Sequence, residues 1–173
     1  EAPGTYNHSI LVGNLAEAAA DAIGANTLLV RVASYYHAIG KLKRPHFYIE
    51  NQRPGENPHD KLQPALSAKI ITSHTVDGAR MLREAHFPQA IIDIVEQHHG
   101  NAELSFFYNK AVENALDPED VKRSDFCYQG PRPQTREAAL VMLADSVQAG
   151  VQALKSNDAA AMEQRVHDVI QEK

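Results

Sequence analysis

Apolar residues recur every three or four positions along most of the 173-residue chain, and this spacing constrains the fold more than any other feature. No segment of useful length alternates apolar and polar residues, as a half-buried strand would. The spacing predicts helices at residues 5–23, 27–38, 64–73, 74–86, 88–98, 103–115, 136–155 and 158–171. We therefore expect an all-α fold in which residues 1–173 form a single-domain helical bundle.

Glycine, proline and hydroxyl residues mark the predicted helix boundaries. Gly24 and Gly100 follow two of the helices, at the position where glycine commonly ends a helix. Residues 43–63 are expected to form a loop, and residues 117–134 are expected to be irregular. Thr135 is the expected N-cap of the 136–155 helix. The apolar residues at helical spacing in the first helix are Ile10, Leu11, Leu15, Ala18, Ala19 and Ile23.

The overall composition narrows the class of partner. With 43% hydrophobic and 23% charged residues, the chain resembles a soluble globular domain. Its net charge of -5 argues against binding to duplex nucleic acid, which requires a basic surface. No segment approaches the roughly 20 apolar residues of a membrane span, so we expect a domain that is not inserted in a membrane. The single cysteine, Cys127, excludes an internal disulfide and fits a reducing compartment.

The start of the chain has no initiating methionine and no recognisable signal peptide. We therefore expect a domain cut from a longer protein, or a processed chain.

Histidine is abundant, with nine in the chain, and several of them fall in or at the ends of predicted helices. Imidazole and carboxylate groups suit transition metals, and ligands from several helices can form a metal site in a bundle core. Asp145 lies within an apolar stretch and is expected to be paired, because an isolated buried charge is costly. The residues alone leave open either a metal site or separate polar contacts. The candidates are His8, His37, His74, His98, His99 and Asp145, whereas helix caps or polar contacts are expected of His46, His59, His86 and His167.

Residues 36–41, Tyr-His-Ala-Ile-Gly-Lys, resemble the H-D-x-G-K signature of the HD phosphohydrolase superfamily, with Ala38 in the aspartate position. The remaining family elements follow the same order, with His8 before this segment and His74, His98-His99 and Asp145 after it. The resemblance covers about residues 1–155 and is greatest to the cytoplasmic HD domain of seven-transmembrane PgpH-type proteins. It is carried by residues 1–9, 47–52, 57–60, 96–100 and 131–135.

This resemblance implies a cytoplasmic domain of a bacterial inner-membrane protein that hydrolyses cyclic di-AMP to linear pApA. It also implies two divalent transition metal ions, with Fe or Mn favoured. By position, His8, His37 and Asp145 would hold the first ion, and His74, His98 and His99 the second. Paired metals can bind a phosphodiester and lower the pKa of a water towards about 7. The oligomeric state and the regulatory signal are not encoded in any motif.

Positively charged residues follow the metal-binding loop. We expect Lys41 to bind a substrate phosphate and to act in catalysis together with Asp145, although a solvated lysine is the alternative. Arg44 is a second expected substrate contact, and it too could be an ordinary surface residue. Four aromatic residues are candidates for stacking on adenine, but such rings more commonly belong to the core: Tyr48, Phe106, Phe107 and Tyr108.

Ala38 changes what the resemblance implies. The aspartate normally at this position would bridge the two metals, and a methyl group cannot ligate either of them. We expect weaker metal occupancy and activity lowered by orders of magnitude, while substrate binding survives. The substitution is either an engineered change that traps substrate or a natural loss of catalysis, and the intact ligand positions favour the first.

Three other functions remain open. The chain could be a degenerate domain that senses a cyclic nucleotide without cleaving it. It could be an HD phosphohydrolase of a mononucleotide, ppGpp or cyclic di-GMP, although no Gly-Tyr-Pro motif, the usual companion of cyclic di-GMP activity, is present. It could also be an all-α scaffold with incidental histidines. Analysis of bound metal tests the scaffold hypothesis, and the activity of the Ala38→Asp variant distinguishes an enzyme from a sensor.

Overall fold

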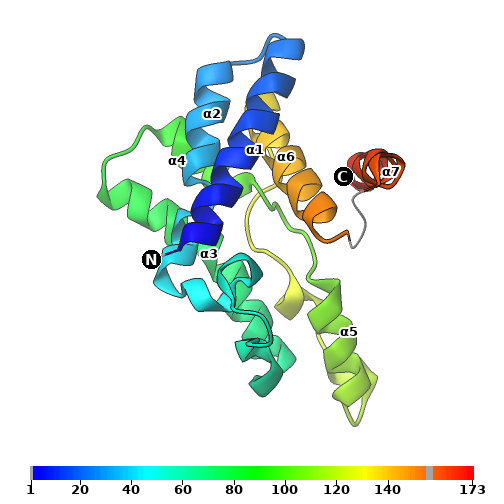
Figure 1. Ribbon diagram of the computed structural model, residues 1–173. Coiled ribbons are helices and arrows are strands. Elements are labelled where there is room, and N and C mark those ends of the chain that lie inside the picture. Colours follow the sequence, from blue (N-terminus) through cyan, green and yellow to red (C-terminus); the bar gives the residue numbers. More distant parts are fainter. Residues whose placement is uncertain (1, 155–157) are drawn as a thin grey trace.

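The computed structural model describes residues 2–154 and 158–173, and its regular elements are helices (Figure 1). Within these residues there is no β-strand, only an isolated bridge between Glu103 and Cys127. The all-α prediction is therefore confirmed. The α-helices are α1 (Pro3–Ala22), α2 (Thr27–Tyr36), α3 (Pro64–Glu84), α4 (Gln89–Gln97), α5 (Ser105–Asn114), α6 (Arg136–Gln152) and α7 (Ala159–Glu172).

The core lies where α1, α2, α4 and α6 meet. α1 packs along α2 and α6, and α4 packs against α2, α3 and α6 (Figure 1). Val12, Val30, Val95 and Val141, one from each of these four helices, are fully buried. α7 packs on α6 at one side of the bundle. No helix in the described part of the chain has the length and apolar character needed to cross a membrane.

α1 buries small residues rather than its largest apolar ones. Ala16 and Ala20 are fully buried, whereas Leu11 and Leu15 are 50% and 45% exposed. The small side chains allow α2 to approach closely: a Cβ on Gly13 would lie 3.0 Å from the ring of Tyr35. The helical spacing of the leucines therefore predicted the helix but not its buried face.

The predicted break between residues 73 and 74 is wrong, because α3 runs without interruption from Pro64 to Glu84. No proline or glycine lies near residue 73, and the hydroxyl groups there are satisfied within the helix. Ser73 donates a hydrogen bond to the carbonyl of Ile70 at 2.9 Å. His74 consequently lies in the middle of a long helix instead of at the start of a shorter one.

Helix ends follow the predicted turn chemistry in most places. Thr135 Oγ1 accepts a hydrogen bond from the backbone N–H of Ala138, so the predicted N-cap is confirmed. α6 ends at Gln152, and the predicted terminus at residue 155 lies outside the described residues. The expected loop at residues 43–63 contains no α-helix or strand and is made of short 3₁₀ turns joined by irregular residues.

Two helices end with the same pair of backbone hydrogen bonds. At the end of α1, Gly24 N–H bonds to Asp21 and Ala25 N–H bonds to Ala20. The corresponding residue after α3 is His86, whose φ of 57° lies in the left-handed region. Glycine adopts this conformation without strain, so His86 is a helix-capping residue at a position that suits glycine better.

Candidate metal centre

Two groups of three ligand atoms lie in the bundle. The first comprises His8 of α1, His37 at the end of α2 and Asp145 of α6. The second comprises His74 of α3 with His98 and His99 at the end of α4. Within each group the ligand atoms all lie within 4.8 Å of one another. The structure therefore brings together all six residues predicted as metal ligands, in the two sets that were predicted.

Three of the histidines are oriented by their own helices. Nδ1 of His37, His74 and His98 lies 2.7 Å from the backbone carbonyl three residues earlier in each case. A carbonyl can only accept, so Nδ1 carries the proton and Nε2 of the neutral ring keeps its lone pair. The Nε2 atoms face other members of the centre. This backbone support is the arrangement that metal-binding histidines use.

The spacing of these nitrogen atoms fits a shared cation. Nε2 of His8 lies 3.1 Å from Nε2 of His37, and Nε2 of His74 lies 3.2 Å from Nε2 of His98. Two nitrogens bound at right angles to one ion, each about 2.1 Å from it, would be about 3 Å apart. Lone pairs that face each other at this distance repel unless a cation or proton lies between them. The donor set and its spacing therefore fit divalent transition metals.

Asp145 connects the two groups. Its carboxylate lies 3.0 Å from Nε2 of His8, 3.6 Å from Nε2 of His37 and 3.7 Å from Nδ1 of His99. Burial alone would raise the pKa of Asp145, but the neighbouring side chains of His37, His8 and His99 hold this pKa well below its ordinary value. The expectation that Asp145 is paired within its apolar stretch is confirmed.

The second group consists of three histidines, whereas the first includes the carboxylate of Asp145. Burial lowers the pKa values of His74, His98 and His99 well below the ordinary value for histidine. Neighbouring histidines add to this effect, and Asp145 partly opposes it at His98 and His99. The three rings are therefore neutral at pH 7. Neutral imidazole is the form that binds metal.

Ala38 lies in the turn that follows α2. It is fully buried and directly follows His37, whose ring centroid lies 5.0 Å from that of His98 in the second group. The next residues form the 3₁₀ turn η1 (Ile39–Lys43), in which Gly40 packs against α3. A Cβ on Gly40 would lie 2.0 Å from the carbonyl oxygen of His74, so only glycine allows this close approach. The turn thereby brings His37 and Ala38 beside His74.

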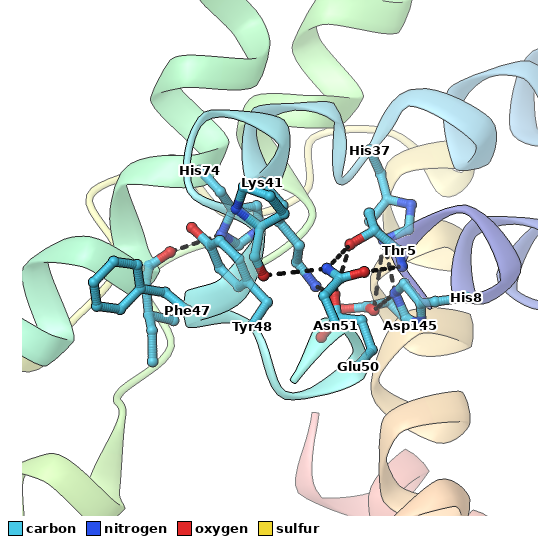
Figure 2. Close-up of polar contacts among 12 residues, drawn as sticks. Thr5, His8, His37, Lys41, Phe47, Tyr48, Glu50, Asn51, His74 and Asp145 are labelled. Atoms are coloured by element: carbon cyan, nitrogen blue, oxygen red, sulfur yellow. Dashed lines mark hydrogen bonds and ion pairs between the residues drawn. The ribbon is translucent and has the colours of Figure 1, made fainter. Parts of the chain in front are cut away.

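A cavity of about 580 Å³ opens beside the ligands. His8, His74, His99 and Asp145 contribute to its wall, together with Lys41, Tyr48, Glu50 and Tyr128. Lys41 Nζ forms an ion pair with Glu50 Oε1 at 2.7 Å and lies 5.2 Å from the centre of the Tyr48 ring. Figure 2 shows Lys41 and Glu50 between His74 on one side and His8 with Asp145 on the other.

The predicted substrate-binding residues differ in their placement. Lys41 lines the cavity, whereas Arg44 is exposed and is absent from the described residues that line it. Among the candidate stacking residues, Tyr48 is buried at the cavity. Phe107 packs against His59 and Tyr108 against Phe126, while Phe106 is 70% exposed.

Glu50 and Tyr128 are parts of the cavity wall that the sequence reasoning missed. The Tyr128 ring stacks on His99, with centroids 4.2 Å apart and an interplanar angle of 26°. Burial raises the pKa of the Tyr128 hydroxyl well above its ordinary value, so it stays a neutral donor. Glu50 belongs to residues 47–52, one of the segments that carry the resemblance to the HD family, and this resemblance could have identified it as a site residue. No spacing rule pointed to Tyr128.

The remaining histidines match the expectation of caps and polar contacts where their contacts are described. His59 is buried, and its Nε2 donates to the carbonyl of Phe47 at 2.9 Å. His86 caps α3 through its backbone. The thiol of Cys127 is partly buried and lies 3.4 Å from the carbonyl of Arg123.

The chain belongs to the HD domain family, because its residues 5–150 match that domain. The chain is 51% identical over 173 residues to the cyclic-di-AMP phosphodiesterase PgpH of Bacillus subtilis and, equally, to that of Listeria monocytogenes. It spans 24% of the length of each of these relatives.

Crystal structures of a relative agree with this assignment. The L. monocytogenes PgpH HD domain superposes with a TM-score of 0.91 at 50% identity, covering 99% of this chain and 79% of that one. The same domain in complex with cyclic-di-AMP gives a TM-score of 0.92 at 51% identity, covering 99% of this chain and 78% of that one. The HD-type fold is therefore established.

Proposed function

We propose that this chain is a metal-dependent phosphodiesterase domain that opens cyclic di-AMP to linear pApA, and that Ala38 weakens its activity. The observation that carries the proposal is the pair of three-ligand groups beside one cavity. The identity to PgpH of two bacteria and the cyclic-di-AMP complex of the Listeria domain support the choice of substrate. In this proposal residues 1–173 form one phosphodiesterase domain, cytoplasmic and part of a bacterial inner-membrane protein.

The proposed metal set follows the two groups. His8, His37 and Asp145 would hold one divalent ion, and His74, His98 and His99 a second, with Fe or Mn favoured by the donor types. Such ions, when bound, lower the pKa of water and offset negative charge on a phosphoryl group. The neutral rings of the second group leave their lone pairs available for this role.

The cavity wall supplies the remaining chemistry. Lys41 presents an ammonium group to the cavity, and a phosphate there would compete with Glu50 for it. Lys41 would thereby orient the phosphodiester and offset the charge that develops on it. The ion pair with Glu50 and the contact with the Tyr48 ring hold Lys41 in place, and its side chain is only 13% exposed. Arg44, which is exposed, would take part only through its charge, which acts on Tyr48 in the cavity wall.

A second function is favoured by one specific observation: the buried residue that follows His37 is an alanine, which has no ligand atom. A domain that binds cyclic di-AMP without cleaving it would act as a sensor for the rest of a longer protein. Binding through Lys41 and the cavity wall does not require the missing carboxylate.

The discriminating experiment measures binding and turnover on the same protein. The chain and its Ala38→Asp variant are loaded with Mn²⁺ or Fe²⁺ and incubated with cyclic di-AMP, with cyclic di-GMP and ppGpp as comparison substrates. Linear pApA formed by the variant alone supports the phosphodiesterase. Stoichiometric binding of cyclic di-AMP without turnover in both proteins supports the sensor, and faster turnover of another nucleotide overturns the substrate assignment.

A further inference from the structure

His8 is oriented by a different kind of contact from the other histidines that use Nδ1 as a donor. His37, His74 and His98 are held by carbonyls of their own helices. Nδ1 of His8 instead lies 2.6 Å from the side-chain Oε1 of Gln148, a residue 140 positions away in the sequence. Its orientation therefore depends on how α1 packs against α6.

Gln148 is placed for this contact by the geometry of α6. It lies three residues after Asp145 on the buried face of the helix and is 9% exposed. Its amide nitrogen donates to Gln152 Oε1 at 2.8 Å, which leaves its oxygen directed at His8. An amide oxygen can only accept, so His8 Nδ1 must carry a proton in this arrangement.

The contact determines what His8 presents to the first ligand group. With Nδ1 held by Gln148, Nε2 faces Asp145 Oδ1 at 3.0 Å and His37 Nε2 at 3.1 Å. Without the acceptor, the ring could turn or exchange its tautomer, and the Nε2 lone pair would no longer point into the group. A backbone carbonyl cannot be lost by substitution, whereas a side-chain acceptor can.

We propose that Gln148 is a positioning residue for the first metal site, which acts by holding the His8 ring and its tautomer in the metal-binding state. This inference rests on the proposed metal centre. Outer acceptors of this kind commonly change metal affinity by about 10- to 100-fold. The first ion, but not the ion held by His74, His98 and His99, depends on this side chain.

The test compares three variants of the whole chain in Mn²⁺ titrations by calorimetry. Gln148→Met removes the acceptor at similar length and is expected to weaken the first site by about 10- to 100-fold. Gln148→Glu keeps an acceptor and is expected to bind at least as tightly as the parent. Gln148→Asn retracts the amide by one methylene while keeping its polarity, and it should behave like Gln148→Met even if that variant folds poorly.

A second measurement reports on the ring itself. NMR of ¹⁵N-labelled histidine in the Zn²⁺-loaded protein should show a downfield, slowly exchanging His8 Nδ1–H in the parent and in Gln148→Glu, and its loss in Gln148→Asn. Equal affinity of the first site in the parent and Gln148→Asn would overturn the inference, as would Gln148→Glu binding as weakly as Gln148→Asn. A parent chain that binds no metal at the two groups would overturn the proposed metal centre as well.

Discussion

The substitution Ala38→Asp tests the proposed centre most directly, because residue 38 is fully buried and directly follows His37, whose ring lies beside that of His98 in the second group. A carboxylate introduced there without metal would add a second buried anion to a site that already holds Asp145. An uncompensated buried charge typically costs about 3 kcal/mol or more. The metal-free variant should therefore be less stable than the parent by about this amount.

Bound metal should reverse this cost. Residue 38 directly follows the candidate ligand His37, so we take roughly 4 Å as the distance over which a carboxylate there would act on a bound ion. At an effective dielectric constant of about 20, a carboxylate and a divalent ion at this distance attract by about 8 kcal/mol, twice the value for two unit charges. About 3 kcal/mol of this offsets the cost of the buried charge, and each 1.4 kcal/mol of the remainder is a factor of ten, so metal affinity should rise on the order of 10³-fold or more.

Two assays measure these effects on the same samples. Mn²⁺ titration followed by thermal unfolding should show a larger metal-induced rise in melting temperature for Ala38→Asp than for the parent. Hydrolysis of cyclic di-AMP by the Mn²⁺-loaded proteins should rise by orders of magnitude. Ala38→Asn has nearly the same shape without the charge and should recover little of either effect. Equal metal affinity and equal hydrolysis in the parent and Ala38→Asp would refute the reasoning.

The other predictions concern the cavity, the buried histidines and the helix ends. Lys41→Met should weaken binding of cyclic di-AMP to the parent chain by roughly tenfold or more, because a charged hydrogen bond is worth about 1.5–3 kcal/mol. Lys43→Met removes a more exposed lysine that is paired with Asp77 and should leave binding unchanged, and equal affinities of the two variants would contradict the role of Lys41. The lowered pKa values of His74, His98 and His99 mean that the unfolded chain takes up protons below pH 6.5 that the folded chain does not. Denaturant unfolding of the metal-free protein should therefore show stability falling as the pH drops below 6.5, by up to about 1.4 kcal/mol per pH unit for each histidine, and a flat profile would argue against neutral buried rings. His86→Gly should stabilise the protein by about 1 kcal/mol and Gly24→Ala should destabilise it by a similar amount, because both positions have positive φ. Chemical denaturation measures the free energy of unfolding of both variants. Changes of the same sign in the two variants would contradict the proposed backbone strain at His86.

The sequence by itself determined the fold class and the members of the candidate ligand set. Helical spacing and the lack of alternating segments led to an all-α fold, because these patterns reflect local backbone preferences. The resemblance to the HD superfamily, carried in part by the order of His8, His37, His74, His98-His99 and Asp145, led to the two candidate groups, and it also marked Ala38 as a departure. Local spacing wrongly predicted a helix boundary at residue 73, where no proline or glycine interrupts the chain and α3 continues.

Only the tertiary structure decided how the candidate centre is held. The contact between His8 and Gln148 joins residues 140 positions apart, and the stacking of Tyr128 on His99 joins two segments with no shared motif. The pairing of Lys41 with Glu50 and the exposure of Arg44 likewise follow from the path of the turns after α2. The spacing of apolar residues indicates only which face of a single helix is apolar. The orientation of a ring or an ammonium group depends on which helices pack together, and that is settled only when the core forms.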